Sequence, residues 1–214
     1  MRSSGLSAVA DVTIVDCGIG NVKSVLRMLE HVDSTAEVVS HPAEATGFNR
    51  LILPGVGAFD AGMAALNRGW REVLDHVALE RRAPVLGICL GMQLLCRGSE
   101  EGRATGLGWI AADVKRLDTG GDPRLKLPHM GWADVTATRP NPIIAQDEGE
   151  QRFYHDHGYA AVCDDPADVI ATASYGTEFT TAVEHGNILG VQFHPEKSHR
   201  FGMALLRRFA TLPC

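Results

Sequence analysis

Residues 84–93 read PVLGICLGMQ, and the interpretation of the whole chain begins from them. Apolar residues lead into the motif Gly-Ile-Cys-Leu-Gly, and a helix-forming run follows. A strand, a sharp turn and a helix around one reactive residue are typical of a nucleophile elbow, here with Cys89 in place of serine. The glycines allow the sharp turn, and the free N–H groups at the start of the helix favour a thiolate. Taken alone, the segment fits a buried cysteine at the end of a parallel strand equally well.

The first half of the chain repeats this order of strand, turn and helix. Predicted strands cover residues 12–17, 36–39, 50–53 and 84–89. Predicted helices cover residues 22–32, residues 60–82 with breaks at Gly62 and Gly69, and the run from the elbow to about Gly98. This alternation predicts a parallel sheet whose ligands bind beyond the carboxyl ends of the strands. The turns at Gly18, Gly55 and Gly87 fall at that edge, so we expect them to surround one crevice.

The second half of the chain is rich in short β segments separated by turn residues. They cover residues 106–117, 131–138, 152–162, 169–175, 179–184 and 188–193, and a final helix is predicted for residues 199–210. We expect antiparallel strands that extend the same sheet or form a small companion sheet. Repeats, linkers and low-complexity tracts are absent from the sequence. Residues 1–214 therefore predict a single α/β domain, with residues 1–11 as a flexible extension.

Composition and charge exclude several classes of function. The chain has 214 residues, of which 45% are hydrophobic and 21% charged, as is ordinary for a globular protein. A net charge of −6 without a run of Lys or Arg argues against a nucleic-acid surface. The sequence shows neither a signal-peptide core nor an apolar run of membrane-spanning length, so we expect a cytoplasmic protein.

The five cysteines do not predict a disulfide framework or a zinc site. Their number is odd, their spacing is irregular, and no C-x-x-C pair is present. The sequence predicts neither a metal site nor a cofactor. In a reducing compartment, one cysteine as a nucleophile and four as packing residues is the simplest interpretation.

The turn after the first predicted strand raises the possibility of a nucleotide site. Gly18 and Gly20 begin a G-x-G-x-x-G pattern, but Lys23 stands where the third glycine belongs. The chain also lacks the Gly-Lys-Ser/Thr of a P-loop. We therefore do not expect a nucleotide at this turn.

A second motif favours the catalytic interpretation of the elbow. Residues 190–198 read GVQFHPEKS and follow a predicted strand. His194 and Glu196, two residues apart in extended chain, point to the same side. A cysteine nucleophile needs a base to take its proton, and that imidazole needs an acid to fix its tautomer. With Cys89, these residues supply all three roles; an exposed salt bridge in a loop is the simpler alternative for His-Pro-Glu alone.

Four blocks of the sequence carry a resemblance to a known family. They are PGVGAF at residues 54–59, GICLGMQ at 87–93, PHMGW at 128–132 and QFHPEKS at 192–198. In this order they resemble the class I (triad) glutamine amidotransferases, and among these the glutaminase subunits of imidazole glycerol phosphate synthase. The resemblance covers nearly the whole chain from about Val12.

The resemblance implies a flavodoxin-like α/β domain that hydrolyses glutamine to glutamate and ammonia. Cys89 would form a thioester with the side-chain carbonyl, His194 would transfer protons, and Glu196 would orient His194. The ammonia would pass to a (β/α)8-barrel cyclase subunit of histidine biosynthesis, bound as a heterodimer.

The same resemblance assigns further residues to three groups. The backbone N–H groups of Val56 and Leu90 would form the oxyanion hole. The glutamine substrate would be held by Gly55, Gly57, Gln93, Glu101, His157, Gly158 and Tyr159. The partner interface would include Asn21, Trp132, Tyr154 and Lys197. Each interface residue also has a simpler interpretation, for example Trp132 in the core and Lys197 as a solvated charge.

The chain departs from the family pattern at positions outside the triad. Ala133 stands where the family usually has Asn, and residues 155–159 read HDHGY in place of a more apolar run. His155 and His157 share a strand face, but two imidazoles without a further ligand do not predict a metal site. The departures leave open a second acceptor for the ammonia, a sugar amidotransferase of surface-polysaccharide synthesis.

Two other classes of function compete with this hypothesis. In a stand-alone cysteine hydrolase of the α/β-hydrolase type the acid precedes the histidine in the chain, whereas Glu196 follows His194. A non-catalytic binding subunit would have no need of the three residues together. Chain order and the intact set of residues therefore argue against both classes.

Overall fold

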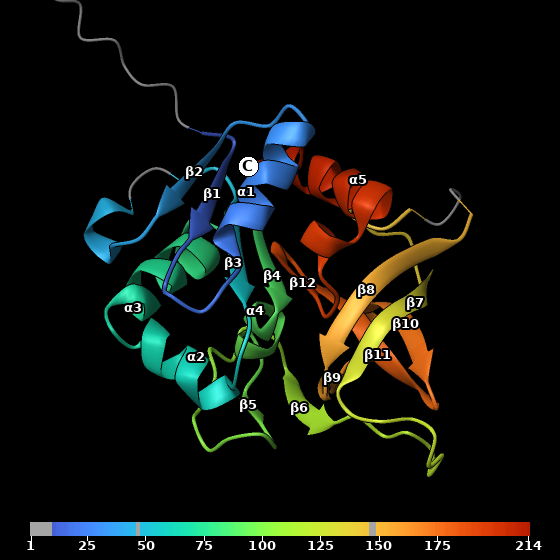
Figure 1. Ribbon diagram of the computed structural model, residues 1–214. Coiled ribbons are helices and arrows are strands. Elements are labelled where there is room, and N and C mark those ends of the chain that lie inside the picture. Colours follow the sequence, from blue (N-terminus) through green and yellow to red (C-terminus); the bar gives the residue numbers. More distant parts are fainter. Residues whose placement is uncertain (1–9, 46–47, 146–148) are drawn as a thin grey trace, which may run out of the picture.

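A long mixed sheet runs through the molecule (Figure 1). The computed structural model describes residues 10–45, 48–145 and 149–214, and in these ranges the sheet has nine strands. Their spatial order is β2 (Ala36–Val39), β1 (Val12–Val15), β3 (Leu51–Gly55), β4 (Val85–Cys89), β12 (Ile188–Val191), β11 (Thr177–His185), β10 (Val169–Tyr175), β7 (His129–Ala137) and β8 (Gln151–His157). Pairing is parallel from β2 to β12 and antiparallel from β12 to β8.

A small companion sheet lies beside the main one. It contains β5 (Gly98–Ser99), β6 (Ala112–Arg116) and β9 (Tyr159–Cys163). Strands β8 and β9 follow each other in the chain with only Gly158 between them, yet they belong to different sheets. The chain therefore crosses from one sheet to the other at Gly158.

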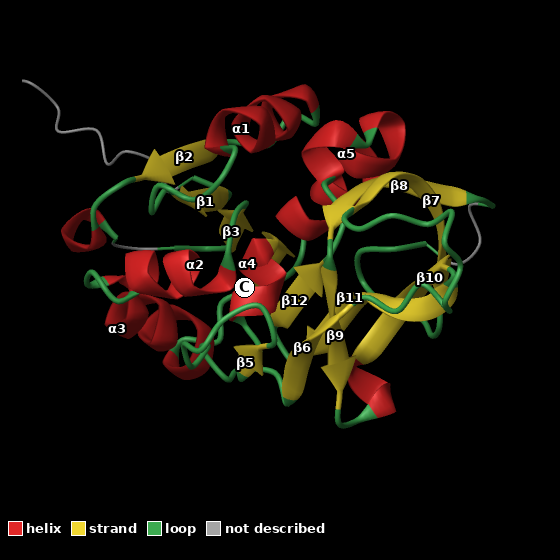
Figure 2. Ribbon diagram, turned by 60° about the horizontal axis from the view of Figure 1, so that its bottom comes forward, coloured by secondary structure: helices red, strands yellow, loops and turns green. Residues whose placement is uncertain are grey.

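Helices cover both faces of the parallel half (Figure 2). The helices are α1 (Val22–His31), α2 (Phe59–Leu66), α3 (Trp70–Asp75), α4 (Leu90–Leu94) and α5 (His199–Ala210), and a π-helical turn, His76–Glu80, continues α3. Helices α1 and α5 lie together on one face, and α2 and α3 lie on the other. Short 3-10 turns span Pro42–Glu44, Pro166–Asp168 and Pro195–Lys197.

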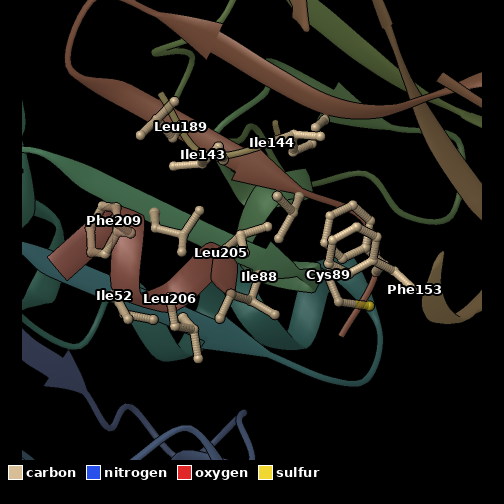
Figure 3. Close-up of a cluster of buried hydrophobic side chains, with 14 of the residues drawn as sticks. Ile52, Ile88, Cys89, Ile143, Ile144, Phe153, Leu189, Leu205, Leu206 and Phe209 are labelled. Atoms are coloured by element: carbon tan, nitrogen blue, oxygen red, sulfur yellow. The ribbon is translucent and has the colours of Figure 1, made fainter. Parts of the chain in front are cut away.

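Alternation along the buried strands divides the core into two layers. Ile52 and Ile88 face α1 and α5, whereas their neighbours Leu53 and Val85 face α2 and α3. Successive strand residues point to opposite faces, so strands that are apolar on both faces are covered by helices on both sides. Figure 3 shows the first layer, with Ile88 packed near Leu205 of α5 and Cys89 at its edge.

The predicted fold class is confirmed, and most predicted elements are present. The parallel first half, the antiparallel second half and the helix His199–Ala210 agree with the sequence analysis. Both alternatives for the second half occur, because β7, β8, β10 and β11 extend the main sheet while β6 and β9 form the companion sheet. No helix in the described ranges is long and apolar enough to cross a membrane.

Four predicted element boundaries were wrong, and in one of them the strand predicted for residues 106–117 covers only Ala112–Arg116. Gly62 does not break the second helix, because it lies inside α2, where the side chain of Leu94 packs against it. The elbow helix ends at Leu94 rather than near Gly98. The strand predicted for residues 152–162 is two strands, divided at Gly158. The break at Gly69 is present, and this residue has a φ of +99°.

The two ends of the described chain are tied together at the amino edge of the sheet. Arg50 donates from Nε to Leu212 O at 2.7 Å and from Nη1 to Asp11 O at 3.2 Å. Asp11 also accepts hydrogen bonds from Thr35, so residue 11 is fixed to the fold. Residues 1–9 of the extension predicted for 1–11 lie outside the described residues.

Phe209 of α5 is fully buried in the first core layer. We expect Phe209→Ala to lower the free energy of unfolding by about 3–5 kcal/mol, because it removes a large apolar side chain and leaves a cavity. Urea unfolding followed by circular dichroism measures the effect. Leu79→Ala, at a side chain that is 52% exposed, is the control and should change the free energy of unfolding by less than about 0.5 kcal/mol. Equal losses in the two variants would contradict this account of the core.

Candidate active site

Cys89 lies at the junction between β4 and α4 with an unusual backbone conformation. Its φ is +53° and its ψ is −111°, in a region that side-chain-bearing residues rarely adopt. The turn is possible only because small residues surround it: a Cβ on Gly91 would lie 1.9 Å from Leu53 O. Cys89 is 6% exposed and lies at the carboxyl edge of the parallel strands. This is the geometry of the elbow that the sequence predicted.

His194 and Glu196 form a buried pair beside the elbow. His194 Nδ1 donates to Glu196 Oε1 at 2.8 Å, and the two side chains are only 2% and 3% exposed. The other ring nitrogen, Nε2, is buried and has no hydrogen-bond partner. Burial lowers the pKa of His194, but the nearby Cys89 sulfur and the Glu196 carboxylate outweigh it and raise this pKa to about 10. The protonated form of the ring is therefore favoured at neutral pH.

The turn that carries this pair is fixed from two sides. Ser198 Oγ donates to His194 O at 2.6 Å and accepts from Tyr154 N at 3.0 Å, and His194 N donates to Tyr154 O at 2.8 Å. On the other side, a Cβ on Gly202 of α5 would lie 1.8 Å from Pro195 O. Strand β8 and helix α5 therefore hold the imidazole in place.

The two predicted oxyanion-hole amides differ in their surroundings. The N–H of Leu90 lies in the first turn of α4, where helix N–H groups have no partner within the helix. The N–H of Val56 instead donates to Ile19 O at 2.5 Å. In this structure the Val56 amide is thus engaged by the loop before α1 and is not available to an anion at Cys89.

A cavity of about 270 Å³ opens above Cys89. Six of the seven residues predicted to bind substrate line it, together with Cys89, the two predicted oxyanion-hole residues and two residues that were not predicted. The lining consists of Val56, Gly57, Cys89, Leu90, Gln93, Glu101, Pro128, Asp156, His157, Gly158 and Tyr159. Gly55, the seventh, lies beneath the cavity wall, packed against Leu90 and Gly91. A cavity of this size suits a small molecule of amino-acid dimensions.

The polar groups around the cavity are held by backbone contacts. Glu101 Oε2 accepts from Phe59 N at 2.8 Å, at the start of α2. His157 Nδ1 donates to Tyr159 O at 2.8 Å, so its Nε2 carries a lone pair, and this nitrogen is buried without a partner. Burial lowers the pKa of His157 to about 3, so the ring is neutral.

Sequence reasoning missed Gln192, Asp156 and Pro128 as site residues. Gln192 Nε2 lies 3.7 Å from Cys89 Sγ, and Asp156 O lies 3.9 Å from the same sulfur. Gln192 and Pro128 each begin one of the four blocks quoted above, and that position was the available signal. Asp156 contributes a backbone carbonyl, which no side-chain pattern reveals.

Three of the four predicted interface residues lie together on the surface. The ring of Trp132 stacks on His199 with centroids 5.7 Å apart and meets Tyr154 edge-on at 6.3 Å. Lys197 Nζ lies 5.3 Å from the centre of the Tyr154 ring and 3.7 Å from Asp156 Oδ2. Trp132 is 39% exposed, which argues against the simpler interpretation as a core residue. The fourth, Asn21, caps α1, the helix that packs against the Pro195–Lys197 turn.

Three buried histidines pack together behind the cavity. The rings of His129 and His155 stack at 5.0 Å, and His157 lies 5.6 Å from the first and 5.4 Å from the second. His155 donates from Nδ1 to Phe153 O and accepts at Nε2 from Thr181 Oγ1, so it is neutral. Burial lowers the pKa of all three rings. Among the described residues, no group of His, Cys, Asp and Glu is arranged to hold a metal ion.

Known proteins resemble this chain over nearly its whole length. The family model "Glutamine amidotransferase class-I" matches residues 13–212. The chain is 44% identical to "Imidazole glycerol phosphate synthase subunit HisH 2" of Pseudomonas aeruginosa, over 94% of this chain and 99% of that one. It is 43% identical to "Imidazole glycerol phosphate synthase subunit HisH" of Leptospira borgpetersenii, over 94% and 100%.

Solved structures show the same fold at lower identity. "Structure of PurLQS from Thermotoga maritima" matches with a TM-score of 0.72 and 19% identity, over 92% of this chain and 96% of that one. A putative GMP synthase protein from Thermoplasma acidophilum matches with a TM-score of 0.69 and 22% identity, over 93% and 91%. These two likenesses concern the fold alone.

The histidine cluster should make the protein sensitive to acid. The pKa of each of the three rings is depressed in the folded state, so the unfolded chain binds more protons once the pH falls below about 6.5, and stability is lost on further acidification. We expect His155→Leu to reduce the pH slope of the unfolding free energy by up to about 1.4 kcal/mol per pH unit. Urea unfolding from pH 7 to pH 4 measures that slope. His41→Gln, at an exposed histidine, should leave the slope unchanged; an unchanged slope in His155→Leu would contradict the prediction.

The raised pKa of His194 depends on its carboxylate partner. We expect Glu196→Gln to lower this pKa by about 1–3 pH units, because burial then opposes the charge with less compensation. The pKa of His194 is higher in the folded protein than in the unfolded chain, where it is about 6.5. The protonated ring therefore contributes its full stabilisation below pH 6.5, and this contribution is lost as the pH rises towards 10. The variant should therefore lose more stability at pH 6 than at pH 10.

Titration of the His194 ring by NMR, with urea unfolding at both pH values, tests this prediction. Asp168→Asn removes the carboxylate from a second His–carboxylate pair, with His185 at 3.0 Å, and serves as the matched control. It should leave the His194 titration unchanged. A His194 titration curve that is the same in Glu196→Gln and in the wild type would refute the assigned cause.

Proposed function

Because this chain belongs to the class I glutamine amidotransferases, we propose that it is the glutaminase subunit of an imidazole glycerol phosphate synthase. It hydrolyses glutamine to glutamate and ammonia and acts with a synthase subunit. The observation that carries the chemistry is the buried His194–Glu196 pair beside Cys89, below a cavity of amino-acid size. The relatives, which are 41–44% identical and bear this name, support the pathway.

The proposed mechanism begins with a cysteine thiolate and a protonated His194. Cys89 Sγ attacks the side-chain amide carbon of glutamine and forms a tetrahedral oxyanion. His194 then protonates the departing nitrogen, ammonia leaves, and a thioester remains. The neutral imidazole next takes a proton from water, which attacks the thioester and releases glutamate. Glu196 holds the ring through Nδ1–H and keeps Nε2 directed to the reaction.

The oxyanion is the point at which backbone geometry matters most. The amide of Leu90 supplies one donor of the proposed hole, and the amide of Val56 supplies the second once the 55–56 peptide turns away from Ile19 O. Glycines flank Val56 on both sides, and Gly57 already has a φ of +110°, so the local chain can make this turn. Each such donor typically lowers the barrier by about 2.7–4 kcal/mol.

The cavity residues hold the rest of the substrate in this proposal. Gln93, Glu101 and His157 offer acceptor atoms that suit the ammonium group of glutamine. Backbone groups of Gly57, Gly158 and Tyr159 complete the cavity, and Gly55 shapes its wall. Glutamine's carboxylate and amide are then placed between these groups and Cys89.

The partner is proposed to be a (β/α)8-barrel cyclase that takes up the ammonia. The exposed cluster of Trp132, Tyr154 and Lys197 supports a docking surface, and Asn21 extends it on the side of α1. In this arrangement the ammonia does not enter bulk solvent, and the two proteins form a heterodimer.

Replacing the nucleophile separates the two halves of the proposed reaction. We expect Cys89→Ala to lower glutamine hydrolysis by about 10⁴-fold or more, because no other group can form the thioester. Synthesis by the partner with free ammonia should persist. An assay of glutamate release, alone and with the partner, measures both activities. Cys214→Ala, at an exposed cysteine, is the control and should behave as the wild type does; undiminished hydrolysis by Cys89→Ala would refute the proposal.

The identity of the acceptor needs an experiment of its own. Glutamine turnover is measured with an imidazole glycerol phosphate synthase cyclase and, separately, with a sugar amidotransferase. We expect activation by the cyclase. Activation by the sugar amidotransferase alone would overturn the assignment to histidine biosynthesis while leaving the glutaminase chemistry in place.

A further inference from the structure

Gln192 lies next to Cys89, the proposed nucleophile, and has no role in the mechanism proposed so far. Its residue is fully buried, between the end of β12 and the turn that carries His194. Its Nε2 lies 3.7 Å from Cys89 Sγ, within hydrogen-bond distance for sulfur, and its Oε1 accepts from Gln93 Nε2 at 3.1 Å. Both the NH₂ group and the oxygen of this buried amide have partners. Leaving either of them without a partner would cost free energy.

The orientation of this amide is set by a neighbouring backbone carbonyl. Gln93 Nε2 donates to Tyr159 O at 3.2 Å, and a carbonyl can only accept. The nitrogen of Gln93 must therefore face Tyr159, and its second hydrogen reaches Gln192 Oε1. With its oxygen so engaged, Gln192 can present only its NH₂ group to Cys89. One carbonyl thus orients two amides in series and directs an N–H donor at the sulfur.

A donor at this position acts differently on the two forms of the cysteine. A neutral thiol is a weak acceptor, whereas a thiolate is a charged one, and hydrogen bonds to charged groups are markedly stronger. A group that binds the charged form better than the neutral form favours ionisation. His194 approaches the cysteine from the same strand end, two residues farther along.

We propose that Gln192 is a further catalytic residue, whose side-chain N–H donates to Cys89 Sγ and stabilises the thiolate. The proposal rests on the proposed function of Cys89 as the nucleophile. It assigns the Tyr159–Gln93–Gln192 series a part in nucleophile activation, in addition to its part in packing. Gln192 then supplies a hydrogen-bond donor to the sulfur, and His194, two residues later, supplies a positive charge.

The test follows the reactivity of Cys89 towards iodoacetamide as a function of pH. The variant Gln192→Met keeps the length and volume of the side chain but removes the donor. We expect the pH of half-maximal alkylation of Cys89 to rise by about one pH unit and the rate at pH 7 to fall about tenfold. Peptide mass spectrometry measures each cysteine separately, so the exposed Cys214 is an internal reference in every sample.

The matched control is Gln151→Met. Gln151 is also a buried glutamine of the main sheet, at the opposite end of β8 from His157. Gln151→Met makes the same chemical change as Gln192→Met, but it should leave the alkylation profile of Cys89 unchanged. A wild-type profile in folded Gln192→Met, or an equal shift in Gln151→Met, overturns the inference. Neither result affects the proposed glutaminase chemistry, which fails if Cys89→Ala still hydrolyses glutamine.

A second measurement on the wild-type chain applies even if Gln192→Met does not fold. The side-chain NH₂ resonances of Gln192 are assigned by NMR and followed from pH 6 to pH 10. We expect them to shift with the same midpoint as the alkylation of Cys89, and to lose this response in Cys89→Ala. Resonances that do not respond to pH in the wild type overturn the inference.

Discussion

The parallel pairing of β4 with β12 is the constraint on which the site depends. Ile88 pairs with Val191, so the next residue of each strand, Cys89 and Gln192, emerge side by side at the carboxyl edge. The two strands are about 100 residues apart in the chain. A shift of this register by one residue would move every side chain of β12 to the other face and separate the imidazole from the sulfur. The chemistry therefore exists only once the last strand has joined the sheet.

Much of the fold could be predicted because its signals are local. Apolar runs bounded by glycine turns gave the parallel strands, and helical spacing gave the helix at 199–210. The errors arose where tertiary contacts override local preference. Gly62 continues α2 because the side chain of Leu94 fills the space beside it, and β8 and β9 separate at Gly158 because they pair with different sheets. A sequence of alternating apolar residues does not record which partner a strand will choose.

The candidate site, like the fold, could be predicted only in part. Cys89, His194 and Glu196 were named from motifs, and the structure brings them together; their roles stay proposals. Neither the Asp156 carbonyl nor the engagement of the Val56 amide could be foreseen, since peptide orientation leaves no mark in the sequence. The histidine cluster was predicted in part. His155 and His157 were expected on one strand face, but His129 belongs to β7, where it pairs with His157.

Arg50 fastens Asp11 and Leu212 to the edge of the sheet opposite Cys89. Asp11 and Leu212 consequently lie near each other, at the edge of the sheet opposite the one that carries Cys89. A tether that starts at Asp11 or at Leu212, such as a linker to a second polypeptide, would start from the edge that takes no part in the chemistry. Residues 11 and 212 can thus be joined by a short loop, and the resulting circular permutant would keep the connection away from the cavity.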